Sequence, residues 1–300
     1  MKILITGGSG LIGTHLTERL IAKHYEVVHL SRSPRRSSAK TFSWKPDERF
    51  IDSEALKGVN VVVHLAGAGI ADKRWNKRYK EEILTSRAAT ARLLVETLRG
   101  SKHDVTTFVS SSGISYYGTG DPTRNAFAEW DPPGNDYMAY VTVEWEREVA
   151  IVKELGIRPV MIRTGLVLTR NGGALDKLTM PVKWFVGAPL GSGSQWINWI
   201  HINDLCDIYI KAIEDTLMEG PYNAVAPNPV SNKELTREIA RVLKRPLWLP
   251  NVPGFVVRMI AGEVAEVVLK GGKVSSKKIE DAGFRFQYRD IEPALKDLLK

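Results

Sequence analysis

The sequence predicts a doubly wound α/β fold, in which a parallel sheet is covered by helices on both faces. Short, continuous apolar runs alternate with helical patterns through the first half of the chain, which is typical of strands buried on both faces. A glycine-rich loop directly follows the first apolar run, as doubly wound nucleotide-binding folds require. The predicted strands are residues 3–6, 27–30, 61–65, 107–110 and 160–163.

Helical spacing of apolar residues places helices between these strands, at residues 11–23, 75–99 and 137–155. After about Gly165 the alternation becomes irregular. The pattern there predicts a helix at 205–216, a short strand at 222–225 and a helix at 231–243, followed by three more helical patterns from Phe255 onward. The helix at 231–243 begins with a capping box, because Ser231 stands at the N-cap and Glu234 follows three residues later.

The composition excludes several classes of protein. Hydrophobic residues at 43% and charged residues at 25% argue against disorder. The 42 Lys and Arg against 34 Asp and Glu leave a net charge of +8, which favours an anionic partner: nucleic acid, a phosphate-bearing small molecule or an acidic membrane surface. The single cysteine, Cys206, excludes a disulfide within the chain, and the six histidines lack the spacing of metal ligands.

No targeting or membrane segment is expected. Only four residues separate Lys2 from the first glycines, which is too short for a signal peptide. Elsewhere no apolar stretch approaches the roughly 18 residues of a membrane span. The chain is therefore expected to be cytoplasmic and without a membrane partner.

The strongest motif is TGGSGLIG at residues 6–13. Gly7, Gly10 and Gly13 form G-x-x-G-x-x-G, and the loop lies between a predicted strand and a predicted helix. Glycines there permit a tight turn and close approach to a pyrophosphate, and the helix offers free N–H groups to the phosphates, beginning at Leu11 and Ile12. The motif predicts a dinucleotide cofactor.

The end of the second strand favours NADP(H) over NAD(H). NAD-binding folds usually place Asp or Glu there to bond the ribose hydroxyls, whereas this strand ends HLSRS at 29–33. Arg32 can pair with a 2′-phosphate, and Ser31 can donate its hydroxyl to it. Arg35, Arg36 and Lys40 extend the basic cluster, and we interpret them mainly as a solvated loop.

Several motifs in order resemble the extended short-chain dehydrogenases/reductases, a family built on the Rossmann fold. They are TGGSGLIG at 6–13, HLAG at 64–67, SSSG at 110–113 with YYG at 116–118, RTG at 163–165, WIHINDL at 199–205 and YNA at 222–224. A narrower resemblance is to the atypical epimerase family with a short C-terminal domain. It is carried by RW at 74–75, Glu82, SR at 86–87, EWE at 144–146 and the segment 272–286. The resemblance implies that Leu65, Ala66, Gly67, Glu82 and Arg87 lie at the nucleotide.

The resemblance also implies catalytic residues, and here the sequence departs from the family. The general family uses a serine with Tyr-x-x-x-Lys; Ser112 and Tyr137 match the serine and the tyrosine, but Val141 stands where the lysine is expected. An unassisted tyrosine has a pKa of about 10 and is a poor base at neutral pH. Arg87 is a candidate to supply the missing positive charge. For Ser112 and Tyr137 a purely structural role also stays open.

Other residues keep two interpretations. His201 either contacts a ligand or bonds structurally at a helix start, and Arg163 either reaches a substrate anion or forms a buried ion pair. The tryptophans of the glycine-rich stretch, Trp184, Trp196 and Trp199, either line a cleft or pack in a core. Basic clusters at 73–80 and 270–278 are either anion sites or solvated faces.

Together these observations predict a Rossmann domain at residues 1–225 and a smaller C-terminal α/β substrate domain at 226–300, with 166–200 contributing to the substrate cleft. The expected function is NADP(H)-dependent hydride transfer at a carbonyl or carbinol carbon, in an oxidoreductase or a nucleotide-sugar-epimerase-like protein. The alternative is a non-catalytic NADP(H)-binding or sensing protein, which the missing lysine supports. The expected partner is a small sugar-like or carbonyl compound; no nucleic-acid motif is present. A homodimer through the helices at 75–99 and 137–155 is expected by analogy.

Overall fold

A single large sheet forms the centre of the computed structural model, which describes residues 1–33, 39–119, 125–170 and 172–300. Its strand order is β11-β7-β6-β5-β1-β2-β3-β4, and only the β3–β4 pair is antiparallel. The strands are β1 (Lys2–Thr6), β2 (Glu26–Ser31), β3 (Lys40–Lys45), β4 (Phe50–Ile51), β5 (Val61–His64), β6 (Thr107–Gly113), β7 (Arg158–Thr164) and β11 (Gly220–Ala224). The predicted fold class is confirmed.

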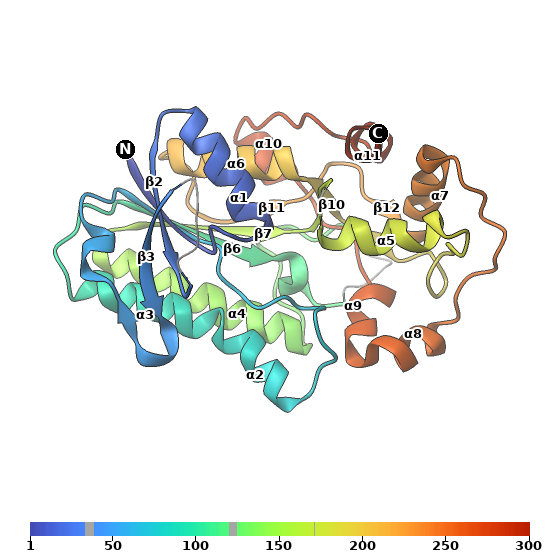
Figure 1. The fold of residues 1–300 in the computed structure, drawn as a ribbon, viewed down its shortest axis with the longest axis horizontal. Helices are drawn as coiled ribbons and strands as arrows, with labels where there is room; N and C mark the ends of the chain where they lie inside the picture. Colours follow the sequence, from blue (N-terminus) through green and yellow to red (C-terminus); the bar gives the residue numbers. More distant parts are fainter. Residues whose placement is uncertain (34–38, 120–124, 171) are drawn as a thin grey trace.

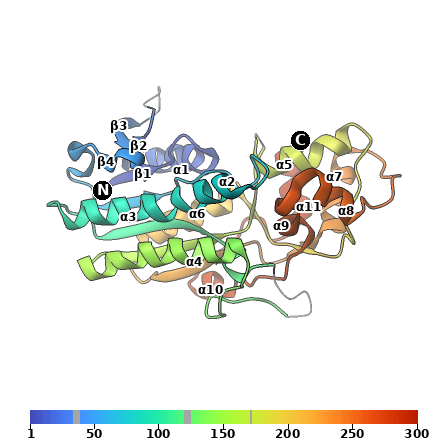
Figure 2. The ribbon, with the colours of Figure 1, turned by 90° about the horizontal axis from the view of Figure 1, so that it is seen from below.

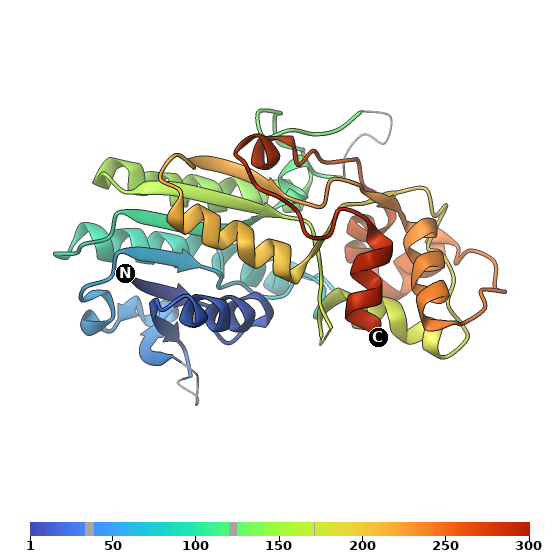
Figure 3. The ribbon, with the colours of Figure 1, turned by 90° about the horizontal axis from the view of Figure 1, so that it is seen from above.

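Helices cover both faces of this sheet (Figures 1 and 3). On one face lie α1 (Leu11–Ala22) and α6 (Ile202–Glu214), and on the other α3 (Ala88–Arg99) and α4 (Tyr137–Ala150), which run side by side (Figure 2). Alternate residues of β1 enter the two cores: Ile3 and Ile5 pack with α1 and α6, whereas Leu4 packs with α3 and α4. The continuous apolar pattern of the strands follows from this burial on both sides.

Five further helices form a smaller lobe beyond one end of the strands (Figure 1). Its elements are α5 (Gly173–Lys183), α7 (Asn232–Leu243), α8 (Gly254–Ala261), α9 (Ala265–Leu269) and α11 (Ile291–Leu299), with the short strands β8 (Leu166–Leu168), β9 (Trp196–Ile197), β10 (Trp199–His201) and β12 (Val230–Ser231). The predicted division at residue 225 does not separate the two lobes cleanly, because each lobe contains a helix from the other side of that residue. In the small lobe α5 packs against α7, whereas α10 (Lys277–Asp281) returns to pack on β11. The division itself stays a prediction.

One predicted helix is wrong as a single element. The pattern at 75–99 forms two helices, α2 (Lys77–Thr85) and α3, separated at Ser86 and Arg87. The side chains at the break bond to backbone outside the helix: Ser86 Oγ accepts from Ala68 N at 3.0 Å, and Arg87 Nη2 donates to Ala68 O at 2.8 Å. The start also moves, because Asn76 caps α2 through Tyr79 N and leaves Trp75 outside.

The other boundaries shift by a few residues, and the tail holds one more α-helix than predicted. From residue 254 onward there are four, α8 to α11, and two of them are five residues long, too short for periodicity to separate. The helix predicted at 137–155 ends as a 3-10 helix, Ile151–Leu155. The capping box of Ser231 and Glu234 is present at α7. Further 3-10 helices are Pro46–Glu48, Ser53–Leu56, Ile114–Tyr117 and Gly262–Val264.

Candidate functional site

The site begins where the order of the sheet reverses. Strand β1 pairs with β2 on one side and with β5 on the other, because the chain adds β2, β3 and β4 in one direction and then crosses back to β5. A crevice forms at the carboxyl ends of strands at such a point, and ligands of doubly wound sheets bind there. The glycine loop, the end of β2 and the end of β5 all meet at this edge.

The glycine loop needs glycine because a side chain at these positions would collide with neighbouring backbone. Gly7 has φ of +71°, and a Cβ there would lie 2.9 Å from the carbonyl carbon of Leu65. A Cβ on Gly13 would lie 2.3 Å from Gly7 O, inside the turn closed by the bond from Gly10 N to Gly7 O at 3.0 Å. Gly10 is exposed, and Gly7 O is the one atom near its added Cβ. The loop is therefore tightly packed against the backbone of Leu65 and open at Gly10, which leaves room for a pyrophosphate.

The first backbone N–H groups of helix α1 have no side-chain acceptor at the N-cap. Its first intrahelical bond joins Thr14 N to Gly10 O at 2.9 Å, so the N–H groups of Leu11, Ile12 and Gly13 precede the helical ladder. The helix has no side-chain cap and no acidic residue in its first turn. An uncapped helix start with these donors favours an anion.

The end of β2 carries Ser31 and Arg32 without a neighbouring acid. Ser31 Oγ accepts from Ser33 N at 3.2 Å and donates to Ser33 O at 3.0 Å, which holds the strand end in a tight turn. Arg32 is exposed beyond that turn. The sequence has no Asp or Glu between Glu26 and Asp47. Arg35 and Arg36 lie outside the described residues, and the Lys40 ammonium lies 4.7 Å from the centre of the Phe42 ring.

The end of β5 brings together four of the residues predicted at the nucleotide. Leu65 N donates to Thr6 O at 3.1 Å, and Ala66 N donates to Thr6 Oγ1 at 3.3 Å. Gly67 packs on Arg87, since a Cβ there would lie 3.3 Å from the guanidinium carbon. Glu82 is not part of this cluster: it is exposed on α2, and its carboxylate lies 3.8 Å from the Lys73 ammonium.

Arg87 is a buried cation whose contacts are all uncharged. Its side chain donates to the carbonyls of Ala68 at 2.8 Å and Ile83 at 3.0 Å, and no carboxylate pairs with it in the described part of the chain. Burial lowers the pKa of Arg87 to about 10, and the nearby hydroxyls of Tyr137 and Tyr79 oppose this effect. Arg87 therefore stays charged at neutral pH, and an anionic ligand would stabilise it.

A chain of hydrogen bonds joins the end of β1 to the end of β5 and to α3. The sequence motifs did not predict it. Thr6 Oγ1 lies 2.7 Å from His64 Nδ1, and His64 Nε2 lies 3.3 Å from Thr90 Oγ1. The Thr90 hydroxyl donates to Ser86 O at 2.7 Å or Arg87 O at 3.0 Å, so between Thr90 and His64 the ring Nε2–H is the donor. His64 also has a hydrogen bond with the backbone of Arg87, and its Nδ1 then accepts from Thr6. Burial lowers the pKa of His64 to about 4, which keeps the ring neutral as this order requires.

The predicted catalytic tyrosine lies on α4 facing α2. The Tyr137 hydroxyl donates to the carbonyl of Lys80, and its ring meets Trp75 edge-on with centres 5.6 Å apart. Burial raises the pKa of Tyr137, and the charge of Arg87 opposes this. Val141, at the position of the missing lysine, is fully buried with Tyr79, Ile83 and Met138.

Ser112, the predicted catalytic serine, lies near the end of β6. Its hydroxyl is buried and donates to Glu146 Oε1 at 2.6 Å, and Arg163 binds both oxygens of that carboxylate at 2.8 Å. Arg163 also donates to the hydroxyl of Tyr117 at 3.0 Å, which in turn donates to Asn223 Oδ1 at 2.8 Å. Of the two interpretations of Arg163, the buried ion pair is the one observed.

The other candidate residues, His201, the tryptophans and the basic cluster at 73–80, have structural contacts or are exposed. His201 caps α6, since its Nδ1 accepts from Asn203 N at 3.1 Å; burial lowers its pKa to about 4. Trp199 is fully buried in the core of the small lobe, whereas Trp184 is 75% exposed. In the cluster at 73–80, Lys80 pairs with Glu263, and Arg74 lies against Gly262, so this cluster contacts the segment after α8.

No group of three or more His, Cys, Asp or Glu side chains among the described residues is arranged to hold a metal ion. No described helix is long and apolar enough to cross a bilayer. The cytoplasmic location stays a prediction.

Comparison with known proteins agrees with this geometry. The model of the NAD dependent epimerase/dehydratase family matches residues 3–224, and a domain of unknown function, DUF1731, matches residues 252–298. A chloroplastic homolog of the epimerase family protein SDR39U1 from Arabidopsis thaliana is 35% identical, covering 100% of this chain and 87% of its own. The epimerase family protein YfhF of Bacillus subtilis is 34% identical, covering 100% and 98%.

A solved structure extends the match to three dimensions. Human epimerase family protein SDR39U1, crystallised with NADPH, superposes with a TM-score of 0.86 at 31% identity and covers 99% of both chains. A nucleoside-diphosphate sugar epimerase from Corynebacterium glutamicum gives a TM-score of 0.81 at 33% identity, over 99% of this chain and 58% of that one. With its glycine loop, its parallel sheet and its C-terminal segment all matched, the chain belongs to the NAD-dependent epimerase/dehydratase family.

Proposed function

We propose that the chain binds NADP(H) in the crevice at the carboxyl ends of β1, β2 and β5. The observation that carries this proposal is the loop of Gly7, Gly10 and Gly13, closed behind by backbone and open in front of an uncapped helix. The first N–H groups of α1, at Leu11 and Ile12, would hold the pyrophosphate. Leu65, Ala66 and Gly67 would form the opposite wall of the crevice. The NADPH in the human relative supports the same cofactor.

Preference for NADP(H) over NAD(H) would come from the end of β2. The exposed guanidinium of Arg32 can pair with a 2′-phosphate through two parallel bonds, and Ser31 lies beside it. The missing acid also removes the partner that a free ribose 2′-hydroxyl would need.

The proposed reaction is hydride transfer at a carbonyl or carbinol carbon of a small molecule, in an oxidoreductase or a nucleotide-sugar-epimerase-like protein. NADP(H) would supply or accept the hydride when bound. Because burial raises the pKa of Tyr137, its hydroxyl stays protonated at neutral pH, which suits a proton donor better than a base. Arg87 would supply positive charge on the same side of the site, where Val141 has replaced lysine. Ser112 stays a predicted substrate contact.

A second candidate function is binding or sensing of NADP(H) without catalysis. Specific contacts favour it: the Ser112 hydroxyl is committed to Glu146 and the Tyr137 hydroxyl to the Lys80 carbonyl. Each would have to leave its partner to reach a substrate. The predicted homodimer stays open under both functions. The ion pair Arg92–Glu148 joins α3 to α4, and Arg99–Glu154 joins α3 to the 3-10 helix after α4.

Binding and turnover measured separately distinguish these functions. Calorimetry should show tighter binding of NADPH than of NADH, and Arg32→Ala should weaken NADPH binding about 10- to 100-fold with little effect on NADH. Arg49→Ala, which removes an exposed arginine paired with Glu96, is the matched control. Equal affinity of the native chain for both cofactors would contradict the assignment.

Turnover is then followed by nicotinamide absorbance across a panel of carbonyl compounds and nucleotide sugars. A change in absorbance supports the oxidoreductase, and epimerised product without net absorbance change supports the epimerase. Tight NADPH binding with neither outcome supports the sensing protein.

A further inference from the structure

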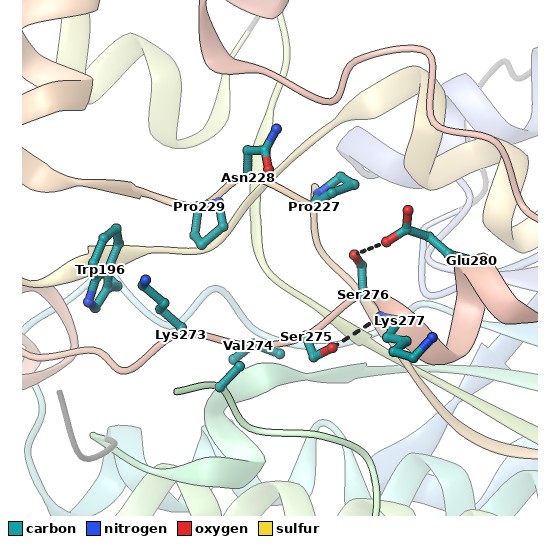
Figure 4. Close-up of a pocket in the computed structure, with 11 residues that line it drawn as sticks. Trp196, Pro227, Asn228, Pro229, Lys273, Val274, Ser275, Ser276, Lys277 and Glu280 are labelled. Carbon is teal, nitrogen blue, oxygen red and sulfur yellow. Dashed lines mark hydrogen bonds between the residues drawn. The ribbon is translucent and has the colours of Figure 1, made fainter. Parts of the chain in front are cut away.

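A groove of about 440 Å³ lies away from the dinucleotide crevice, beside the carboxyl end of β11 (Figure 4). Its walls come from four segments: Ala126, Trp196 in β9, residues 227–229 after β11, and residues 273–280, which lead into and enter α10. None of the glycine loop, the end of β2 or the end of β5 lines it. The volume lies within the range of small-molecule sites, about 300–1,000 Å³.

Lys273 gives this groove an uncompensated positive charge. Its ammonium lies 4.1 Å from the centre of the Trp196 ring, and Figure 4 shows it between that ring and Pro229. The neighbouring lysines are engaged otherwise: Lys270 pairs with Glu266 at 2.8 Å, and Lys277 with Asp281 at 2.9 Å. Within the described ranges Lys273 has no carboxylate partner. The indole therefore holds a charged, half-buried ammonium at the opening without neutralising it.

The other polar groups of the groove leave room for an anion. Glu280 is the one acid in the lining, and its carboxylate already accepts from Ser276 Oγ at 2.7 Å and from Arg289 at 3.0 Å. Ser275 Oγ accepts from Lys277 N at 3.1 Å, which leaves its hydroxyl hydrogen free to donate. A lysine ammonium is a point charge that suits a phosphate, whereas planar carboxylates favour the fork of arginine.

Apolar side chains form two facing parts of the lining, and Asn228 lies between two of them. Pro227 and Pro229 form one wall and Val274 the opposite one, so the space between them suits the C–H faces of a sugar ring. We propose that this groove is a second ligand site, which binds a sugar-sized molecule carrying a phosphate ester, with the phosphate at Lys273 and Ser275. The site is separate from the proposed NADP(H) crevice and does not depend on it.

The test uses the full chain and measures binding by calorimetry. The probes are ribose 5-phosphate, ribose and inorganic phosphate. Ribose 5-phosphate should bind more tightly than either fragment, and saturating NADPH should not displace it. Lys273→Met should weaken its binding about tenfold or more, since a charged hydrogen bond is lost, and Lys273→Arg should retain most of it. Lys270→Met removes a nearby paired lysine outside the lining and should leave binding unchanged.

Three results would overturn the proposal. They are absence of binding to the native chain, equal binding by Lys273→Met and the native chain, and competition by NADPH, which would place the phosphate in the dinucleotide crevice. Circular dichroism and the affinity for NADPH establish that each variant is folded. A failure of NADPH binding in the native chain would contradict the proposed function and leave the groove to be judged by the phosphate probes alone.

Discussion

Two neighbouring parts of the same sheet edge are built in opposite ways. At β1, β2 and β5 the edge is open: glycines replace side chains, α1 starts without a cap, and Arg87 lies buried without an acid. At β6, β7 and β11 the edge is closed, because the polar side chains satisfy one another in a buried network around Arg163. The first part is incomplete without a ligand, whereas the second is complete by itself. The structure therefore supports cofactor binding more directly than it supports catalysis.

The largest expected effect is a loss of stability on changing Arg163, in the closed part of the edge, with little loss of cofactor binding in the open part. Arg163→Met should lower the free energy of unfolding by about 3–5 kcal/mol, because it leaves the Glu146 carboxylate buried without a counter-charge. Affinity for NADPH should change less than about threefold, since the network does not reach the glycine loop. Urea unfolding and calorimetry measure the two quantities.

The matched control for that variant is Arg92→Met. Arg92 pairs with Glu148, but its side chain is 52% exposed, so the loss should stay below about 1 kcal/mol. If Arg163→Met instead weakens NADPH binding as strongly as it destabilises the fold, the two parts of the edge act as one unit.

Acid should weaken the open part through His64. Its pKa is about 4 in the folded chain against 6.5 in the unfolded one, so the unfolded chain binds the extra proton first. This contribution to stability is full above pH 6.5 and is lost as pH falls toward 4, by on the order of 3 kcal/mol. Unfolding free energies at several pH values between 7 and 4 give the slope.

His64→Gln should flatten that slope by up to one proton, and His24→Gln, at an exposed residue, should leave it unchanged. An identical slope in His64→Gln and the native chain would contradict the assignment of the acid sensitivity to His64. His201 has a similarly low pKa, and burial also lowers the pKa of His29, so both contribute to the slope that remains.

The smallest expected effect tests the bond chain at the open edge. Thr90→Val removes one of the hydrogen-bond partners of the His64 ring, which should cost about 1 kcal/mol of stability and weaken NADPH binding severalfold through Ala66 and Arg87. Thr90→Ser should restore both. Thr236→Val breaks the same kind of bond, from Thr236 Oγ1 to Asn232 O at 2.8 Å, in a helix far from the crevice. Equal effects of both valine variants on NADPH binding would show that Thr90 acts on stability alone.

The sequence predicts the open part better than the closed part for a physical reason. A glycine loop must lie at fixed spacing after a strand, so Gly7, Gly10 and Gly13 are visible in one short segment. The network around Arg163 joins Ser112, Glu146 and Asn223 from three distant segments, and no local spacing encodes it. The break between α2 and α3 was missed likewise, because it depends on bonds to the loop at Ala68. His64 opens the motif HLAG, but its hydrogen bonds to Thr6 and Thr90 were not predicted, because they join segments far apart in the sequence.

The packing of Val141 has a consequence for protein engineering. Its side chain fills a space bounded by Tyr79, Ile83 and Met138, so a lysine placed there would carry an ammonium into an apolar cluster beside the charge of Arg87. The Tyr-x-x-x-Lys pair therefore cannot be rebuilt by exchanging one residue. A designer who wants that chemistry in this chain must first reshape the contact between α2 and α4.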